Sequence, residues 1–151
     1  MHSTQKICAA ALFALASQGA LADEHIIQAV IDHWNPQTTF AKPGDTIKFM
    51  NMTGHDTQSY DNMIPDGAKP WKAELGQTGF SVTVDKEGAY IFRCNPHVSM
   101  GMVGAIVVGD KVPPNLPKIE AEVQNVKLAQ NMVNRAVKKM KEELKAKGML
   151  Q

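Results

Sequence analysis

The chain has 151 residues, of which 44% are hydrophobic and 21% charged, and its formal net charge is +1 at pH 7. This is the balance of an ordinary globular protein with room for one domain and an extension. A near-neutral chain without a basic stripe is a poor partner for nucleic acid, and its longest apolar run is too short to span a membrane.

That apolar run belongs to a leader-like segment at the N-terminus. Lys6 precedes apolar residues 7–16, and Ala20-Leu21-Ala22 follows as an A-x-A cleavage signal. This arrangement is typical of a secretory signal peptide. A buried N-terminal helix is the alternative, and the small residues at the cleavage positions disfavour it. We therefore predict that residues 1–22 are a cleaved signal peptide and that the mature protein begins at Asp23.

Cleavage would change the cysteine content. The chain has two cysteines; Cys8 would leave with the leader, and Cys94 would remain alone. A single cysteine in an oxidising compartment cannot form an internal disulfide, and a bare thiol there is open to oxidation. We therefore expect Cys94 to be deeply buried or bound to a metal.

Residues 23–110 follow a pattern of short strands and turns. Ile47 and Phe49 alternate with Thr46 and Lys48, the period of two that marks a half-buried strand. The other strand signals are the runs 26–31, 80–84, 90–94 and 103–108, with turn sequences at 42–45 and 85–88. Short strands with frequent turns predict an all-β fold, a β-sandwich, for this domain.

Residues 111–151 form an extension of different character. Pro113, Pro114 and Pro117 exclude a continued strand, and a helical pattern follows them. Apolar residues then recur at steps of three and four, which predicts a helical face packed on the sandwich: Val126, Ala129, Val133, Ala136, Val137, Met140 and Leu144. The extension is basic, with nine Lys and Arg against four Asp and Glu.

The candidate metal ligands lie mainly in the loop between two predicted strands. Cys94, His97, Met100 and Met102 fall within nine residues, and His55 ends an earlier strand. A sandwich can bring two such strand ends together at one pole. Thiolate, two imidazoles and a weak axial thioether are the ligands of blue-copper electron-transfer sites.

Each of these residues alone would more often be structural, because a lone Cys packs as a small hydrophobe. The joint pattern favours one copper ion held by His55, Cys94, His97 and a methionine. Zinc fits less well, because a thioether is not a usual zinc ligand, and a thioredoxin-like motif is excluded because His97 replaces its second cysteine. Spacing alone leaves Met100 and Met102 both open as the axial ligand.

The residues around this loop resemble a known family. Residues 90–97, Met100-Gly101-Met102-Val103-Gly104 and Val108-Gly109-Asp110 are similar to the copper loop of the pseudoazurins, as are Gly54-His55 and residues 63–68. The resemblance implies an eight-stranded Greek-key cupredoxin with a C-terminal helical extension. It also implies Met102 as the axial ligand, with Met100 at the surface beside His97.

Three positions depart from the family pattern. Asp56 stands where the family usually has Asn, and Asn95 where it usually has Thr. We expect an Asp acceptor and an Asn donor to keep the hydrogen-bonded link across the site with its polarity reversed. The backbone N–H of Asp56 should still reach the Cys94 sulfur. Thr53 replaces a common Lys, which weakens the inference of the family's usual partners.

The function that the resemblance implies is one-electron transfer in the periplasm, by a monomer that is not an enzyme. Its partners would be redox proteins such as a c-type cytochrome and a copper nitrite reductase. The electron should leave through His97, inside an apolar docking patch of Met63, Pro65, Pro96 and Met100. Such patches suit short-lived complexes.

The alternative function is copper binding or delivery in the periplasm. Delivery proteins tend to use exposed, exchangeable ligands. His25 and His33 near the mature N-terminus could form such a site, but two histidines are weak evidence for one and are more often ordinary surface residues. A buried Cys94 argues against easy exchange of the metal.

Overall fold

The computed structural model describes residues 21–151. The predicted signal peptide lies outside the described residues, apart from Leu21 and Ala22, and its removal stays a prediction. Among the residues described, no helix has both the length and the apolar character needed to cross a bilayer.

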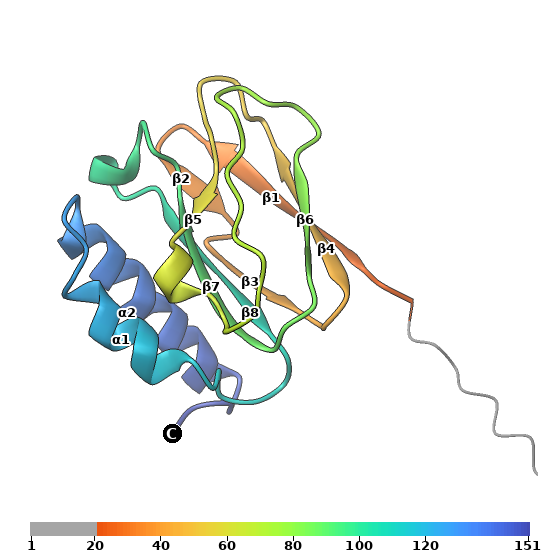
Figure 1. The fold of residues 1–151 in the computed structure, drawn as a ribbon, viewed down its shortest axis with the longest axis vertical. Coiled ribbons are helices and arrows are strands. Elements are labelled where there is room, and N and C mark those ends of the chain that lie inside the picture. Colours follow the sequence, from red (N-terminus) through yellow and green to blue (C-terminus); the bar gives the residue numbers. More distant parts are fainter. Residues whose placement is uncertain (1–20) are drawn as a thin grey trace, which may run out of the picture.

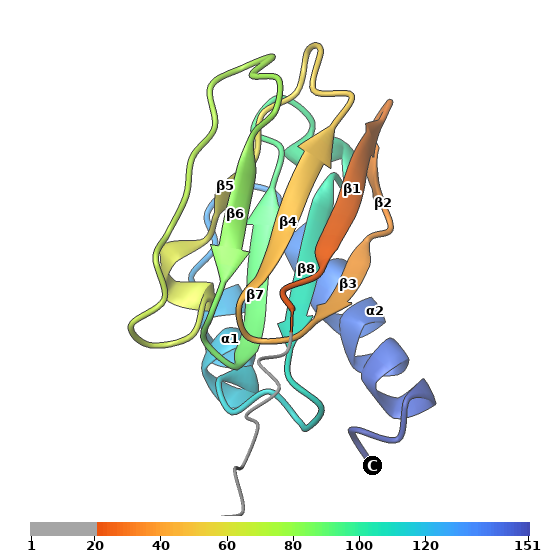
Figure 2. The same cartoon turned by 90° about the vertical axis from the view of Figure 1, so that its right-hand side faces the viewer.

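Eight strands form two four-stranded sheets that lie face to face (Figures 1 and 2). The strand order is β2-β1-β4-β6 in one sheet and β3-β8-β7-β5 in the other. β1 pairs with β4, and β3 with β8, in parallel; the other ladders are antiparallel. The bounds are β1 Glu24–Val30, β2 His33–Asn35, β3 Thr38–Ala41, β4 Asp45–Met50, β5 Gln58–Ser59, β6 Ser81–Val84, β7 Gly88–Arg93 and β8 Val103–Val108. The predicted sandwich of about eight strands is confirmed.

The burial of the strands explains their sequence patterns. β4 alternates as predicted, with Ile47 and Phe49 buried and Lys48 between them partly exposed. Every residue of β8 is buried, because one face of this strand meets the opposite sheet and the other face meets the helices. A continuous apolar run is the pattern expected of a strand covered on both faces.

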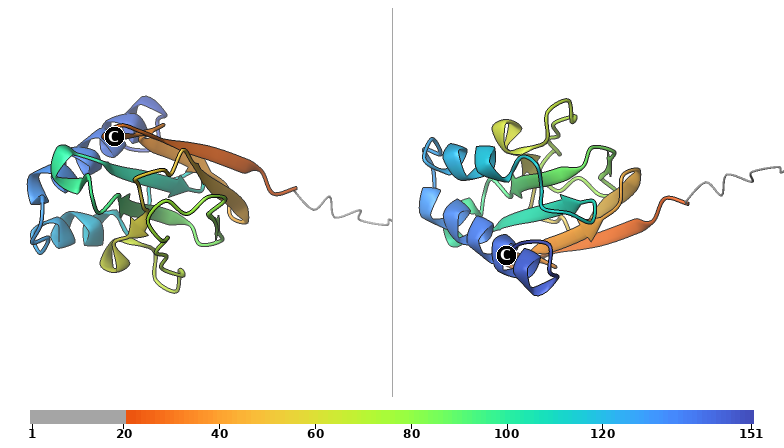
Figure 3. Two further views of the ribbon diagram at one scale, coloured as in Figure 1. Left: turned by 90° about the horizontal axis from the view of Figure 1, so that it is seen from above. Right: turned by 90° about the horizontal axis from the view of Figure 1, so that it is seen from below.

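Two helices form a third layer against the sheet of β3, β8, β7 and β5 (Figure 3). α1 spans Leu116–Val123 and α2 spans Gln130–Ala146. The predicted stripe runs along α2 from Val133 to Leu144. Val126 and Ala129 lie in the connection between the helices instead, and Ala129 takes a left-handed backbone with φ of 57°. The helical extension is confirmed, as two helices.

The molecule has two apolar cores. The first lies between the sheets, where Trp34, Phe49 and Phe92 pack with ring centroids 5.4–5.6 Å apart. The second joins the helices to the outer face of their sheet. The connections that follow β4 and β7 lie at one end of the sandwich, the upper end in Figure 1, together with the long connection that leads into β6.

Candidate metal centre

Cys94 directly follows β7 and points into the core between the sheets. Its side chain is fully buried in one cluster with Phe92, which lies two positions earlier on the same strand face. Phe92 is paired with Gly104 of β8, where a Cβ atom would approach the Phe92 ring to 2.4 Å. A glycine is required at position 104, because any side chain there would clash with the Phe92 ring, which packs in the same cluster as Cys94.

The loop after Cys94 carries His97 and folds back on itself. The His97 carbonyl accepts hydrogen bonds from the N–H groups of Met100 at 3.0 Å and Met102 at 3.2 Å, and Cys94 N–H donates to the Met102 carbonyl at 3.0 Å. Gly101 closes the turn with φ of 107°, a conformation in which a side chain would be strained. As a result, Nδ1 of His97 lies 3.4 Å from the Cys94 sulfur.

His55 reaches the same sulfur from the connection between β4 and β5. Gly54 precedes it with φ of 78°, and the His55 N–H donates to the Met52 carbonyl at 2.8 Å. Gly76, from the long connection before β6, donates to the His55 carbonyl at 2.8 Å. Nδ1 of His55 lies 3.6 Å from the Cys94 sulfur, so two distant segments converge on one thiol.

These separations suit one metal ion bonded to all three side chains. Metal–ligand bonds of about 2.0–2.3 Å, at angles between tetrahedral and trigonal, place sulfur and nitrogen about 3.5–3.8 Å apart. The sulfur–nitrogen distance of 3.6 Å falls in this range and that of 3.4 Å lies just below it. The three ligand atoms all lie within 4.8 Å of one another. Two imidazoles and one thiolate, with a methionine buried nearby, form the ligand set of blue-copper sites.

In the absence of a metal, the electrostatics of the site favour a neutral, coordinating His55 and a protonated Cys94. Burial lowers the pKa of His55, with a contribution from nearby His97, so its ring is held neutral and free to coordinate. Burial raises the pKa of the Cys94 thiol, and the backbone N–H groups of Asp56 and His97 oppose this. A bound metal deprotonates a coordinating thiol outright.

The two methionines of the loop occupy different environments. Met102 is fully buried in the same apolar cluster as Cys94, whereas Met100 is 59% exposed. Only Met102 therefore lies on the inner side of the loop with the thiol. This burial is what the family resemblance predicts for the axial ligand.

Asp56 and Asn95 link the two ligand segments. The Asp56 carboxylate accepts from the Asn95 N–H at 2.6 Å and from its side-chain amide at 2.9 Å. The reversed polarity expected from the sequence is thus observed. The link holds the residue after His55 to the residue after Cys94, so it fixes both ligands relative to each other.

A polar chain that the sequence did not reveal continues from Asn95. Its amide also donates to Gln58 at 3.0 Å, and its side-chain oxygen accepts from Arg93 Nε at 2.7 Å. The Arg93 guanidinium lies 4.5 Å from the ring centroid of Tyr60. Gln58 and Arg93 face each other in the β5–β7 ladder, a pairing that no local sequence signal indicates.

The predicted apolar patch is only partly correct. Pro96 and Met100 are exposed beside His97, which is itself partly exposed. Met63 and Pro65 are buried, and their assignment to the docking surface was wrong. Met63 is 2% exposed and packs in the second core with the helices. Prolines and methionines in loops carry no periodicity that would show which way they face.

Leu75 is an exposed apolar residue that the sequence did not single out. It is 65% exposed and adjoins Gly76, which is bonded to His55. Leu75 therefore lies at the metal-binding end of the sandwich. Exposed leucines in a loop give no sequence signal of their own, so only the contact between Gly76 and His55 reveals its place.

The two histidines considered for an exchangeable copper site are far apart. His25 lies near the start of β1 and binds Asp45 at 2.8 Å. His33 pairs with Val30 at the other end of β1 and contacts Asp32 at 3.1 Å. They share no site, so the alternative of an exchangeable copper site at these two histidines is not supported.

Comparison with known proteins agrees with this geometry. Residues 29–109 match the family model for copper binding proteins of the plastocyanin/azurin family. The chain is 43% identical to the pseudoazurin of Methylorubrum extorquens over 102 residues, which are 67% of each chain. It is 32% identical to the pseudoazurin of Paracoccus pantotrophus over 145 residues, 85% of this chain and 97% of the relative.

Solved structures show the same likeness. The crystal structure of pseudoazurin from Methylobacterium extorquens AM1 superposes with a TM-score of 0.63 at 34% identity, covering 78% of this chain and 98% of the other. Pseudoazurin from Hyphomicrobium denitrificans gives a TM-score of 0.62 at 29% identity, covering 77% and 97%. The likeness therefore spans nearly the whole of these proteins, including their helices.

Proposed function

Because this chain belongs to the pseudoazurins, within the plastocyanin/azurin family of copper-binding proteins, we propose that it is a periplasmic carrier of single electrons. One copper ion would be held by His55, Cys94, His97 and Met102. The convergence of Nδ1 of His55 and of His97 on the buried Cys94 sulfur carries this proposal.

When it is bound, copper supplies a one-electron couple between Cu(I) and Cu(II), and the protein supplies a ligand set that is held in place. The folded loop after Cys94 and the link between Asp56 and Asn95 hold the ligands in position. Ligands that need not move lower the cost of changing the oxidation state. Burial of Cys94 and Met102 keeps solvent from the thiolate.

The partly exposed ligand His97 would be the exit for the electron. Around it we propose a docking surface made of Pro96, Met100 and Leu75, three exposed apolar residues. A small apolar surface gives weak, short-lived contacts, which a carrier between partners requires. A c-type cytochrome and a copper nitrite reductase are the candidate donor and acceptor, and the chain would act as a monomer.

We further propose three segments: a cleaved signal peptide at residues 1–22, a copper-binding domain at 23–110, and a helical extension at 111–151. Export would place the protein in the periplasm, where its single remaining cysteine is protected by burial and by the metal.

The test is the visible spectrum of the copper-loaded protein. We expect an intense blue colour from charge transfer between the Cys94 thiolate and Cu(II), which is lost in Cys94→Ser. A wild-type protein that binds Cu(II) without colour would exclude the blue-copper assignment. Competition with a copper chelator separates a carrier from a delivery protein, because a carrier with a buried thiolate should release copper slowly.

A further inference from the structure

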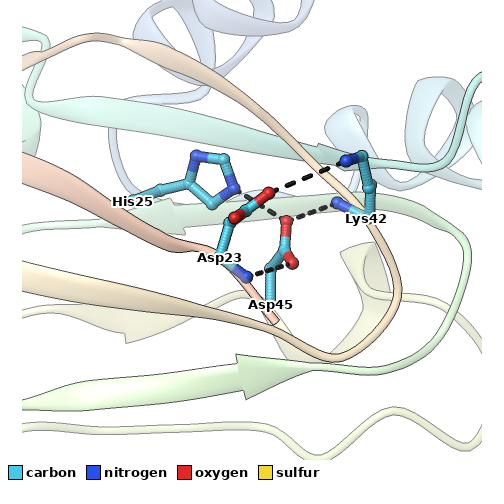
Figure 4. A network of polar contacts seen from close by, with 4 residues as sticks. All are labelled: Asp23, His25, Lys42 and Asp45. Carbon is cyan, nitrogen blue, oxygen red and sulfur yellow. Dashed lines mark hydrogen bonds and ion pairs between the residues drawn. The ribbon is translucent and has the colours of Figure 1, made fainter. Parts of the chain in front are cut away.

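At the end of the sandwich opposite the metal centre, the Asp45 carboxylate binds the start of β1 (Figure 4). Asp45 opens β4 and is 2% exposed. It accepts hydrogen bonds from the Asp23 N–H at 2.9 Å, from His25 at 2.8 Å and from the Lys42 N–H at 2.8 Å. A carboxylate removed from solvent in this way needs such partners to offset its lost hydration.

Asp45 is ionised over a wide pH range. Burial on its own raises its pKa, but the hydrogen bonds from Lys42, His25 and Asp23 outweigh that effect and lower the pKa from 3.8 to about 2. Nearby, Lys42 Nζ lies 3.7 Å from the Asp23 carboxylate. β6 contributes the uncharged Val84 as the strand partner of Asp45. Among residues 21–151, the one cationic partner of the Asp45 carboxylate is His25, which is charged only when protonated.

Asp23 is where the folded domain begins. Its carbonyl accepts from the Thr46 N–H at 2.9 Å, and the next residue, Glu24, opens the parallel ladder opposite Thr46. On the N-terminal side of Asp23, the side chain of Leu21 is 91% exposed. The peptide bond between Ala22 and Asp23 thus joins an exposed segment to a residue whose nitrogen is held against a buried carboxylate.

We propose that Asp45 is the binding site for the α-amino group that cleavage between Ala22 and Asp23 creates. This inference rests on the proposed cleavage position and not on the copper site. Hydrolysis breaks the C–N bond; the water oxygen joins the Ala22 carbonyl carbon, which leaves as a carboxylate, and the Asp23 nitrogen becomes an ammonium. The nitrogen keeps its place 2.9 Å from Asp45 Oδ1, and a neutral hydrogen bond becomes an ion pair.

Processing would therefore stabilise the mature domain. Hydrogen bonds between charged groups are roughly twice as strong as neutral ones, and a buried carboxylate gains a cation that does not depend on His25. Cleavage one residue earlier, before Ala22, leaves an uncharged amide N–H on Asp23. Cleavage one residue later, after Asp23, removes the Asp23 nitrogen that donates to Asp45.

The test compares the copper-loaded mature chain beginning at Asp23 with two matched forms: a chain beginning at Ala22, and a chain whose Asp23 amine is acetylated. Both controls keep the N–H donor and lack a charge on the Asp23 nitrogen: the acetylated form has no α-ammonium, and the form beginning at Ala22 carries it one residue earlier. We expect the unfolding midpoint at pH 7 to be about 4 °C higher for the free amine, with an unfolding constant about fivefold smaller. Asp45→Asn should abolish the difference among the three forms.

The advantage should also depend on pH. An α-amino group has a pKa of about 7.7–8.0 when free, and a carboxylate beside it raises that value. Its contribution is then complete below about pH 7.7 and is lost as the pH rises through the folded-state value. Equal midpoints for all three forms at pH 7 would overturn the proposal, even if Asp45→Asn fails to fold. N-terminal sequencing of the exported protein that finds a start other than Asp23 would also overturn it, and the blue spectrum of the same samples reports separately on the copper site.

Discussion

The Asp56 carboxylate accepts two hydrogen bonds from Asn95, at 2.6 Å from the backbone N–H and at 2.9 Å from the side-chain amide. Asp56 follows one proposed ligand, His55, and Asn95 follows another, Cys94. His55 lies before β5 and Cys94 lies after β7, so both are just beyond the end of the β5–β7 ladder, which begins at Gln58 and Arg93. This pair of hydrogen bonds is thus a direct tie between the two ligand segments.

Asp56→Ala should weaken both the fold and the site. It leaves the partly buried Asn95 N–H without an acceptor, which costs about 1–3 kcal/mol of unfolding free energy. It also removes a carboxylate that favours Cu(II) over Cu(I), so the reduction potential should rise. Chemical unfolding and redox titration check these effects.

The matched control for that variant is Asp61→Ala. Asp61 is exposed and accepts a bond of 3.2 Å from the Ser59 hydroxyl, so its loss should change stability by about 0.5 kcal/mol or less. Equal losses of unfolding free energy in the two variants would show that the hydrogen bonds between Asp56 and Asn95 do not stabilise the protein.

Met102→Leu should raise the reduction potential, because losing a weak sulfur ligand destabilises Cu(II) relative to Cu(I). Met100→Leu should leave the potential and the blue spectrum near their wild-type values, since the Met100 side chain is 59% exposed. Protein-film voltammetry of both variants gives the answer. The reverse pattern would assign the axial ligand to Met100.

Met100→Lys and Leu75→Lys together should slow electron transfer to a redox partner. Each places a charge in the proposed docking surface at an exposed position, so the spectrum and the potential should be unchanged. Stopped-flow measurement of the transfer rate is the readout. An unaltered rate would remove this surface from the docking site.

Met63→Lys tests the corrected placement of Met63 separately. Met63 is 2% exposed in the second core, so a lysine there must be buried without a partner or must disrupt the packing. We expect a loss of several kcal/mol of unfolding free energy. A stable Met63→Lys protein would place Met63 at the surface after all.

Leu144→Ala should show how firmly the helical extension is joined to the sandwich. Leu144 is fully buried on α2, and truncating a buried leucine costs about 2–5 kcal/mol. Leu128→Ala is the control, because Leu128 is 63% exposed. Thermal unfolding followed by circular dichroism and by blue absorption should give one coincident transition if the extension and the copper domain unfold together. Two separate transitions would show that the extension folds independently.

Much of the architecture and of the site was evident from the sequence. The alternation of Ile47 and Phe49 reports which side of a strand is covered, and that is a local property of the chain. The spacing of Cys94 and His97 is equally local, because a short loop keeps its ends close whatever surrounds it. The sequence also indicated the helical extension, although the break at Ala129 needed a left-handed backbone that alanine rarely adopts.

What only the tertiary structure decided depends on contacts between segments far apart in the chain. The stacking of the sheets and helices buries Met63 and Pro65 and leaves Leu75 exposed near His55. It also separates His25 from His33. The bonds from Asn95 to Gln58 and from Asp23 to Asp45 follow from the strand ladders. Loop residues have no periodicity, and a long-range polar partner leaves no mark on its neighbours in sequence. Their roles are therefore determined by the register of the strands. That register depends on how the strands pair across the whole sheet, and no short segment of the sequence specifies it.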